Sequence, residues 1–467
     1  MSWSETGLTL EGVPVSAYPA LRELVAAFAS HRSRWGVEDD AGGGNGSGNG
    51  SGSGSGNIDD VGAAIGEQLA EVSSESVTIR SADVVRPGRP GLISVIADVP
   101  GRLVHAVLGL RAPGDDVQFL VDADDSPLGI FEDGDGLAVV FDATADAELM
   151  RCLLEAVGGG SHGEFERVRR IAVTDETVSV TFDDRVAFTI YQQLPPDEGP
   201  HPGLELFLGL DAVGFNHLLA PIAVWRRGRT ALGIVREYQA GTTGGWSLAL
   251  TSLRDLYAAG GEPDRAGGDF AAEARRLGTM TARMHMGLDQ AFGRQMGDIA
   301  AWVAEVEDAV QRVDPGLLAT ETVAGLLDDL RTSNTRCAAI RTHGDFHLGR
   351  VSRNDLGWYV LDFSPGGRSE FTAGVMTADG TDFRSPMADV ADMLWSFHHV
   401  AVVAAAERDP YDRLGLSELG HAWEVRNRRA FLSEYLVTPG IGSLVPPTRD
   451  MVRNLAAAFE LERSASM

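Results

Sequence analysis

The second half of the chain carries apolar residues at helical spacing. From Trp246 onward, apolar side chains recur at positions i, i+3 and i+4, a pattern that gathers them on one face of a helix. It predicts helices over 270–288, 296–313, 317–332, 386–407 and 419–436. Only the segment 359–363, with a partner strand near Val351, interrupts this pattern as a short hairpin.

Strand patterns dominate the first half instead. Alternating or continuous apolar runs, broken by Gly and Pro, predict strands over 77–79, 91–99, 103–110, 117–121, 137–141, 167–173, 177–182, 186–191 and 231–238. Helices are predicted over 21–35, 145–157 and 201–215, and 241–245 reads as a flexible crossing. A sheet lobe, a hinge and a helical lobe with one hairpin are typical of a bilobal kinase.

The composition along the chain suggests how it divides. Residues 42–57 contain only Gly, Asn and Ser, so this run cannot bury enough apolar surface to offset its ordering entropy, and we expect it to be disordered. We predict an N-terminal cap over 1–95, an intermediate β-rich subdomain over 96–160, a small lobe with hinge over 161–240 and a helical lobe over 241–467.

Charge and residue usage narrow the function classes. The formal net charge of the 467-residue chain is −28, which makes nucleic acid and anionic membranes poor partners. No apolar stretch is long enough to cross a bilayer, and two distant cysteines, Cys152 and Cys337, form no disulfide framework. We therefore expect a cytoplasmic protein.

The sequence contains no lysine, so any phosphate must be met by Arg, a metal, backbone N–H groups or a helix N-terminus.

The most informative stretch is RTHGDFHLGRVSRNDLGWYVLDF, residues 341–363. Asp345 precedes the hairpin, and Asp362 ends its second strand. Phosphoryl transfer from ATP needs one Asp to position the acceptor hydroxyl and a second to hold Mg²⁺ against the phosphates. Two other interpretations stay open: His343, Asp345 and His347 bind a divalent metal directly, or they form a polar loop without catalysis.

Several segments in the same order resemble one family of sugar kinases. THGDFHLG and WYVLDF look like the catalytic loop of the maltokinases and the actinobacterial glucosamine kinases, which are similar in fold to aminoglycoside phosphotransferases and protein kinases. The further matches are SHRSRWG, VVFDAT, REYQAGTTGGWSLAL, SPMADVADMLWSFHH and WEVRNRRAFLSEY. The resemblance implies an α+β, bilobal protein-kinase-like fold with an N-terminal cap, and ATP and Mg²⁺ as cofactors.

The resemblance also implies roles for individual residues. Asp345 would be the catalytic base, Asp362 the Mg²⁺ ligand, and His347 would lie beside the sugar. The hinge residues Glu237, Tyr238 and Gln239 would offer backbone groups to adenine, and Glu205 matches the helix Glu that normally pairs with a strand Lys. His343 and Asp389 would support the catalytic loop, Asp389 through hydrogen bonds. Trp423, Glu424 and Arg428 either line the sugar pocket or belong to an amphipathic helix with internal ion pairs.

The chain departs from the family pattern at several positions. Thr189 stands where the strand Lys is expected, and Arg350 replaces a Gln that is a second Mg²⁺ ligand in maltokinases. Arg cannot bind a cation, but it can clamp a phosphate, so we expect Arg350 to offset phosphate charge. Ser364, Pro365, Gly366 and Gly367 stand in place of Glu-Gly-Glu-Pro, and the sequence ends before the aromatic-rich segment that contacts the sugar in the family.

Three functions follow as expectations. The first is ATP-dependent phosphorylation of maltose to maltose 1-phosphate. The second is phosphorylation of glucosamine, whose ammonium group would need a carboxylate such as Glu424. The third is a degenerate kinase that binds nucleotide, a sugar or an enzyme of trehalose and glycogen metabolism without turnover.

Overall fold

The computed structural model describes most of the chain, which folds into two compact units. The described residues are 4–7, 11–12, 18–32, 72–115, 117–122, 127–133, 136–158, 165–174, 176–197, 199, 201–265, 267–363, 383–408 and 413–465. The first unit comprises Met1–His201 and Ala220–Ala240, and the second comprises Pro202–Leu219 and Gly241–Met467. The predicted disordered run 42–57, the residues 364–367 and most of SHRSRWG lie outside the described residues.

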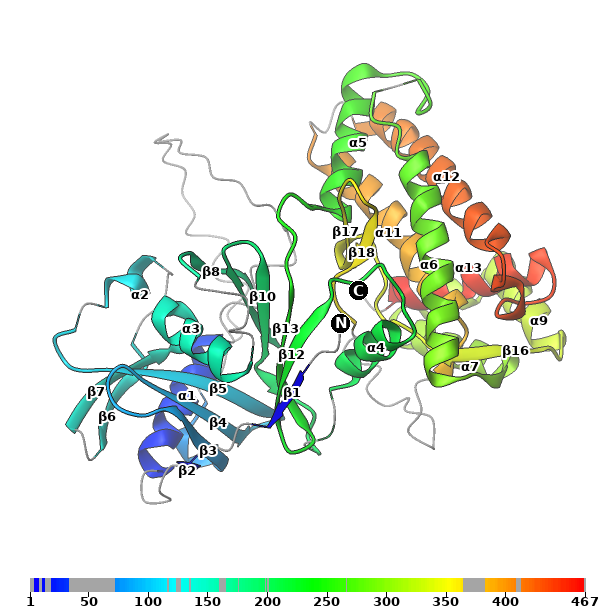
Figure 1. Cartoon of the computed structure of the whole chain (residues 1–467). Helices are drawn as coiled ribbons and strands as arrows, with labels where there is room; N and C mark the ends of the chain where they lie inside the picture. Colours follow the sequence, from blue (N-terminus) through cyan, green and yellow to red (C-terminus); the bar gives the residue numbers. More distant parts are fainter. Residues whose placement is uncertain are drawn as a thin grey trace, which may run out of the picture. The chain divides into compact units, whose positions relative to one another are not determined.

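One sheet of the first unit is built from antiparallel hairpins. Its strand order is β2-β3-β4-β5-β7-β6, and α1 (Tyr18–Arg32) packs Leu21, Leu24 and Phe28 into the apolar core of this sheet (Figure 1). The strands are β2 (Glu11–Gly12), β3 (Thr78–Arg86), β4 (Gly91–Val99), β5 (Arg102–Arg111), β6 (Gly129–Asp133) and β7 (Gly136–Asp142). The predicted domain boundary between residues 95 and 96 is wrong, because it falls inside β4, which is paired on both sides.

The second sheet of this unit has the order β1-β12-β13-β10-β9-β8. Its strands are β1 (Ser4–Gly7), β8 (Val168–Val173), β9 (Thr177–Phe182), β10 (Val186–Tyr191), β12 (Pro221–Arg227) and β13 (Thr230–Glu237). After β10 the chain continues into β11 (Gln193–Leu194), which pairs with β5 of the first sheet. His105 of β5 is buried at this junction, where its Nδ1 lies 2.8 Å from the carbonyl oxygen of Tyr191, and burial lowers its pKa to about 4. The intermediate subdomain and the small-lobe sheet therefore form one unit.

Helices make up most of the second unit. They are α4 (Pro202–Ala212), α5 (Gly245–Ala259), α6 (Ala271–Phe292), α7 (Ile299–Val313), α8 (Pro315–Leu318), α9 (Glu321–Thr332), α11 (Met387–Ala406), α12 (Arg413–Val437) and α13 (Arg449–Ala465). Helix α6 packs along α12, and α11 packs against α12, α13 and α5 (Figure 1). Helix α4 belongs to this unit rather than to the predicted small lobe, because it packs on α6.

Two small sheets interrupt the helices of the second unit. One has the order β14 (Thr243–Gly244), β17 (Val351–Arg353), β18 (Trp358–Val360), so the predicted hairpin is confirmed and the predicted flexible crossing contributes a strand. The other has the order β15 (Gln295–Asp298), β16 (Arg336–Arg341), β19 (Phe383–Arg384). The prediction that the hairpin alone interrupts the helices is therefore wrong.

Two element predictions fail for local reasons. The apolar run 117–121 is not a strand but the short helix α2 (Gln118–Asp122), because so short a run has no period that separates helix from strand. The predicted helix 296–313 begins only at Ile299, because the Asp298 side chain accepts a hydrogen bond from Ala300 N–H and caps α7 there. Among the described residues, further short helices are α3 (Ala147–Ala156), η3 (Ser74–Ser76), η4 (Ala143–Ala145), η6 (Leu348–Arg350) and η7 (Ile441–Ser443).

Within the described part of the chain, no helix combines the length and the apolar character that crossing a membrane would need.

The contact between α6 and α12 depends on Gly278. A Cβ at this position would lie 2.3 Å from the carbonyl oxygen of Phe431, a backbone atom that cannot turn away. We expect Gly278→Ala to reduce the free energy of unfolding by about 1–3 kcal/mol, the usual effect of overpacking. The matched control is Gly325→Ala in α9, where a Cβ meets nothing within 4 Å and helix propensity favours Ala. Urea unfolding followed by circular dichroism measures the free energy of unfolding of both variants. Equal stability of Gly278→Ala and Gly325→Ala would contradict the close approach of α6 and α12.

Candidate functional site

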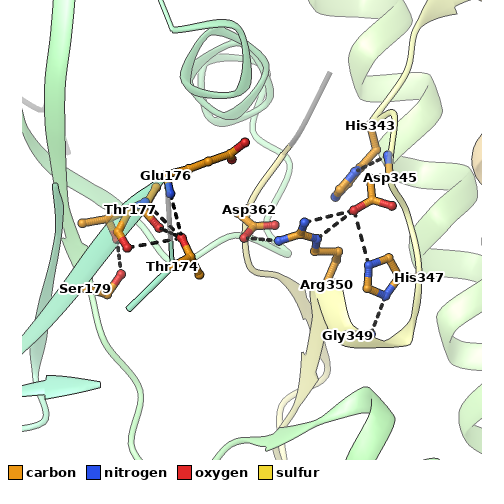
Figure 2. A network of polar contacts seen from close by, with 11 residues as sticks. Thr174, Glu176, Thr177, Ser179, His343, Asp345, His347, Gly349, Arg350 and Asp362 are labelled. Atoms are coloured by element: carbon orange, nitrogen blue, oxygen red, sulfur yellow. Dashed lines mark hydrogen bonds and ion pairs between the residues drawn. The ribbon is translucent and has the colours of Figure 1, made fainter. Parts of the chain in front are cut away.

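The HGD loop, which we define as residues 342–347, connects β16 to the η6 turn and the β17–β18 hairpin. His343 and Asp345 are buried, and Asp362 follows β18 two residues on. Gly344 has a φ of +90°, a conformation that L side chains rarely adopt, so the turn between His343 and Asp345 requires glycine. This local geometry brings the two carboxylates of the predicted catalytic pair onto neighbouring segments (Figure 2).

Asp389, in the first turn of α11, is the anchor of this loop. Its Oδ2 accepts a hydrogen bond from the His343 N–H at 2.8 Å, and its Oδ1 accepts one from the Gly344 N–H at 3.0 Å. Its Oδ2 also lies 3.1 Å from Nε2 of His285, whose Nδ1 is 2.9 Å from the hydroxyl of Tyr435. Burial alone would raise the pKa of Asp389, but these hydrogen bonds and the neighbouring histidines lower it below its usual range.

Asp345 is surrounded by donors. Arg463 of α13 donates from Nη1 to Oδ1 at 2.7 Å, and Arg350 donates to Oδ2 from Nη2 at 3.0 Å and from Nε at 3.2 Å. His347 Nε2 lies 3.4 Å from the same Oδ2. Burial raises the pKa of Asp345, since its side chain is only 8% exposed, yet the contact with His347 and the charges of Arg463 and Arg350 outweigh burial and hold the pKa well below its usual range.

Arg350 joins the two carboxylates. Its Nη1 donates to Oδ2 of Asp362 at 3.0 Å while its other nitrogens contact Asp345, so one guanidinium spans both residues (Figure 2). His347 is oriented locally: its Nδ1 accepts the Gly349 N–H at 3.1 Å, which leaves the ring proton on Nε2, facing Asp345. The side chains predicted at the centre of the site are therefore brought together.

The donor set fits one Mg²⁺ better than two. Among the described residues, no group of three or more His, Cys, Asp or Glu side chains is placed to hold a metal ion by itself. Mg²⁺ in kinases is commonly held by one or two carboxylates together with phosphate oxygens and water. Asp362 is half exposed and is the carboxylate expected to take this part, whereas Arg350, at the position where the family resemblance implies a second ligand, is cationic. The interpretation of His343, Asp345 and His347 as a direct metal site gains nothing from these contacts.

The expected Lys–Glu pair is replaced by two separate arrangements. In the second unit, Glu205 of α4 pairs with Nη1 of Arg341 at 3.2 Å, and the Arg341 guanidinium lies 4.8 Å from the centroid of the Phe292 ring. In the first unit, the Thr189 hydroxyl of β10 is buried and hydrogen-bonded to the Ser179 hydroxyl at 2.8 Å. An arginine of its own unit therefore provides the counter-ion of Glu205.

The predicted hinge follows β13 in the first unit. The Glu237 N–H donates to the Ala220 carbonyl at 2.9 Å, and the Tyr238 N–H donates to the Arg185 carbonyl at 2.8 Å. These two N–H groups are used by the fold itself, so they do not offer donors to adenine. The other backbone groups of Glu237, Tyr238 and Gln239 stay candidates for nucleotide binding.

Two residues of helix α12 do not have the role in a sugar pocket that was predicted for them. Trp423 is 1% exposed and packs against Phe270 and Phe397, so the prediction that it lines a sugar site is wrong. Arg428 makes a two-fold ion pair with Glu460 of α13 at 2.7 and 2.8 Å and has a structural role. Glu424 lies 3.1 Å from Nδ1 of His398. The interpretation of an amphipathic helix with ion pairs is the better one for Trp423 and Arg428.

The sequence pattern does not reveal three residues that contribute to this region. His285 and Tyr435 complete the hydrogen-bond chain behind Asp389, and Arg463 contacts Asp345 from 118 residues along the chain. The helical periodicity of α6, α12 and α13 places such residues on buried faces, but it does not show which distant loop each one meets.

The fold and this loop define the chain as a kinase with a protein-kinase-like architecture. No family model matches the chain. A glucosamine kinase of Streptacidiphilus jiangxiensis is 30% identical over 314 residues, which span 63% of this chain and 67% of that protein. The chain belongs to the glucosamine kinase family of carbohydrate kinases, which confirms that part of the resemblance.

Solved structures agree with this fold. A glucosamine kinase in complex with glucosamine, ADP and inorganic phosphate has a TM-score of 0.56 and 20% identity, over 82% of this chain and 88% of that one. Another glucosamine kinase structure, crystal form A, has a TM-score of 0.54 and 20% identity, over 79% of this chain and 84% of that one. The expected α+β, bilobal protein-kinase-like fold is therefore confirmed.

The contacts of Asp389 predict a pH-dependent stability. Asp389→Asn removes the charge that two loop N–H groups and His285 face, so we expect the free energy of unfolding to fall by roughly 1–3 kcal/mol near pH 7. Because the pKa of Asp389 is lower in the folded chain than its ordinary value of 3.8, this stabilisation is complete above that value and is lost as the pH falls through the folded pKa.

Urea unfolding of the wild type and Asp389→Asn between neutral and acidic pH measures this difference. The difference in the free energy of unfolding between the wild type and Asp389→Asn should become smaller below about pH 4. The matched control is Asp355→Asn in the exposed turn between β17 and β18, which should match the wild type throughout. A difference between wild type and Asp389→Asn that is absent at neutral pH, or that grows towards acid, would contradict the anchoring role.

Proposed function

We propose that the chain is an aminosugar kinase that transfers the γ-phosphoryl group of Mg²⁺-bound ATP to a hydroxyl of glucosamine. The observation that carries this proposal is the pair of carboxylates, Asp345 and Asp362, on either side of one guanidinium in the HGD loop and hairpin. Family membership supports the aminosugar. Maltose, the first expectation from the sequence, gains no support from the comparisons, and neither does a partner enzyme of trehalose or glycogen metabolism.

Asp345 is proposed to act on the acceptor. Its lowered pKa keeps it ionised at neutral pH, so it accepts a hydrogen bond from the acceptor hydroxyl and orients that oxygen toward the γ-phosphorus. As the new O–P bond forms, the bond from phosphorus to the β–γ bridging oxygen breaks. ADP leaves with that electron pair, and the hydroxyl proton passes to Asp345.

Asp362 and Arg350 are proposed to offset the negative charge of the phosphates, Asp362 through Mg²⁺ and Arg350 directly. Asp362 would hold Mg²⁺, which neutralises charge on the phosphate oxygens when it is bound. Arg350 would then release Asp362 and turn to a phosphate oxygen, the task of the absent lysine. A charge-assisted hydrogen bond of this kind contributes about 1.5–3 kcal/mol, or one to two decades in rate if it acts in the transition state.

The sugar contacts are proposed for residues on the same unit. His347 lies beside Asp345 and presents its Nε2 proton to the region where the acceptor must approach. Glu424 is the carboxylate proposed to face the ammonium group of glucosamine. His398 and Arg428 already surround it, so it is held in one orientation.

A binding protein without turnover is the second candidate. One observation favours it: Arg350, which stands where the family resemblance implies a second metal ligand, pairs with both carboxylates at once. Such a chain would bind nucleotide or sugar without needing Mg²⁺. The two candidates make opposite predictions for variants of the loop.

Replacing Asp345 tests the kinase. We expect the wild type to release ADP from Mg²⁺-bound ATP with glucosamine, and Asp345→Asn to lose about 10²–10⁴-fold in kcat, the usual contribution of a positioned base. Asp355→Asn is the matched control, because Asp355 is exposed in the hairpin turn and should leave kcat unchanged. The assay runs glucosamine, maltose, glucose and an aminoglycoside in parallel. Equal rates for the wild type and Asp345→Asn on every sugar would refute the proposed kinase.

Replacing Arg350 separates the two candidates. If Arg350 clamps a phosphate, Arg350→Gln should lower kcat by about 10–100-fold. If Arg350 instead blocks an inactive site, Arg350→Gln frees both carboxylates and should leave the rate unchanged or raise it from background. ATP binding by calorimetry, with and without Mg²⁺, completes the comparison: binding that ignores Mg²⁺ supports the protein without turnover.

A further inference from the structure

The two oxygens of Asp345 have different partners. Oδ2 faces Arg350 and His347, while Oδ1 faces Arg463 of α13 (Nη1 to Oδ1, 2.7 Å). Arg350 is shared with the half-exposed Asp362, so it has an alternative partner within reach. Arg463 is only 13% exposed and lies beside Asp345 on the buried side of the site.

We propose that Arg463 is a positioning residue for Asp345: it holds Oδ1 permanently, so that Oδ2 is the oxygen that receives the acceptor hydroxyl. This inference rests on the proposed function. It separates the donors around Asp345 into a fixed one, Arg463, and one that exchanges, Arg350. The carboxylate then keeps a single orientation when Arg350 leaves it for a phosphate.

Helix α13 is built to hold Arg463 in place. The residues on its N-terminal side are fixed by two-fold ion pairs: Glu460 with Arg428 of α12, and Glu462 with Arg384 of β19 at 2.9 and 2.7 Å. The Arg463 guanidinium also lies 5.6 Å from the ring centroid of Trp395 in α11. Arg463 therefore lies next to residues that partly buried ion pairs tie to α12 and β19.

Stability alone does not account for Arg463. Its Nε is buried and has no hydrogen-bond partner among the described residues, an arrangement that costs free energy. Its strong contact is to Asp345, the residue proposed to receive the acceptor proton. A poorly satisfied arginine that meets such a carboxylate is more easily explained by positioning than by folding.

Steady-state kinetics of Arg463 variants test the proposal. We expect Arg463→Ala to lower kcat about 10–100-fold, because a reacting group that is misplaced by about 1 Å costs on that order, while the KM and calorimetric Kd for ATP stay within about twofold. Arg463→Lys keeps a charge on a stem of similar length and should recover part of kcat. Guanidinium ions at millimolar concentration should partly rescue Arg463→Ala. A merely structural arginine would show neither recovery nor the split between kcat and ATP affinity.

The matched control lies on the same helix. Arg453 is exposed and pairs only weakly with Asp450 in the next turn back, so Arg453→Ala should leave kcat and the melting temperature unchanged. If Arg463→Ala does not fold, Arg463→Lys and Arg463→Gln carry the test, with a kcat order of Arg, Lys, Gln expected.

Three results would overturn the positioning role. The first is a folded Arg463→Ala with the kcat of the wild type. The second is a higher kcat, which would make Arg463 a restraint on Asp345. The third is a parallel loss of kcat, ATP affinity and melting temperature without rescue. Absence of turnover by the wild type on every sugar is a different result: the proposed kinase itself fails, and the positioning role fails with it.

Discussion

A buried carboxylate that binds two backbone N–H groups is the interaction on which the rest of the site depends. Asp389 is wholly buried at the start of α11, where the helix N-terminus favours an anion, and it fixes His343 and Gly344 directly. Losing these hydrogen bonds would leave the Asp389 charge or the two N–H groups unpaired in the core, and this cost favours the observed loop conformation. The positions of Asp345 and the η6 turn, which follow directly in sequence, depend on this anchored segment.

The absence of lysine explains how the remaining charges are arranged. An arginine carries a planar fork of donors, so it can contact two carboxylates at once, as Arg350 does with Asp345 and Asp362. A lysine ammonium is a compact point charge and would not bridge them in this manner. Glu205 likewise pairs with Arg341 in its own unit, since no lysine exists to meet it. Using arginine in place of lysine therefore changes which residues are joined, although both side chains carry one positive charge.

The sequence predicts local features well and distant partners poorly. The HGD loop, the hairpin and the two carboxylates could be predicted from the motif. Its residues are close in sequence, joined by one turn and one hairpin, so their spacing constrains their geometry. Strands β9 and β10 match their predicted bounds because the polar turn of Asp183, Asp184 and Arg185 separates two apolar stretches. The sequence leaves the role of Trp423 open because an aromatic residue on a helix has the same spacing whether it faces a ligand or the core; the structure buries it. Arg463 could not be predicted, since its contact joins segments 118 residues apart.

The two arginines that contact Asp345 differ in the partners available to them. From this difference we infer the order of steps in the proposed reaction. A carboxylate that is buried needs its charge compensated at every stage, because an unpaired charge in the interior is strongly unfavourable. If Arg350 alone supplied that compensation, its move to a phosphate would leave Asp345 unpaired and inclined to take up a proton. The Arg463 contact offers a way around this conflict: in the proposed mechanism Arg463 stays paired with Asp345 while Arg350 changes partners. On this proposal, one arginine binds phosphate in a site without lysine because a second arginine, Arg463, still contacts the carboxylate of Asp345.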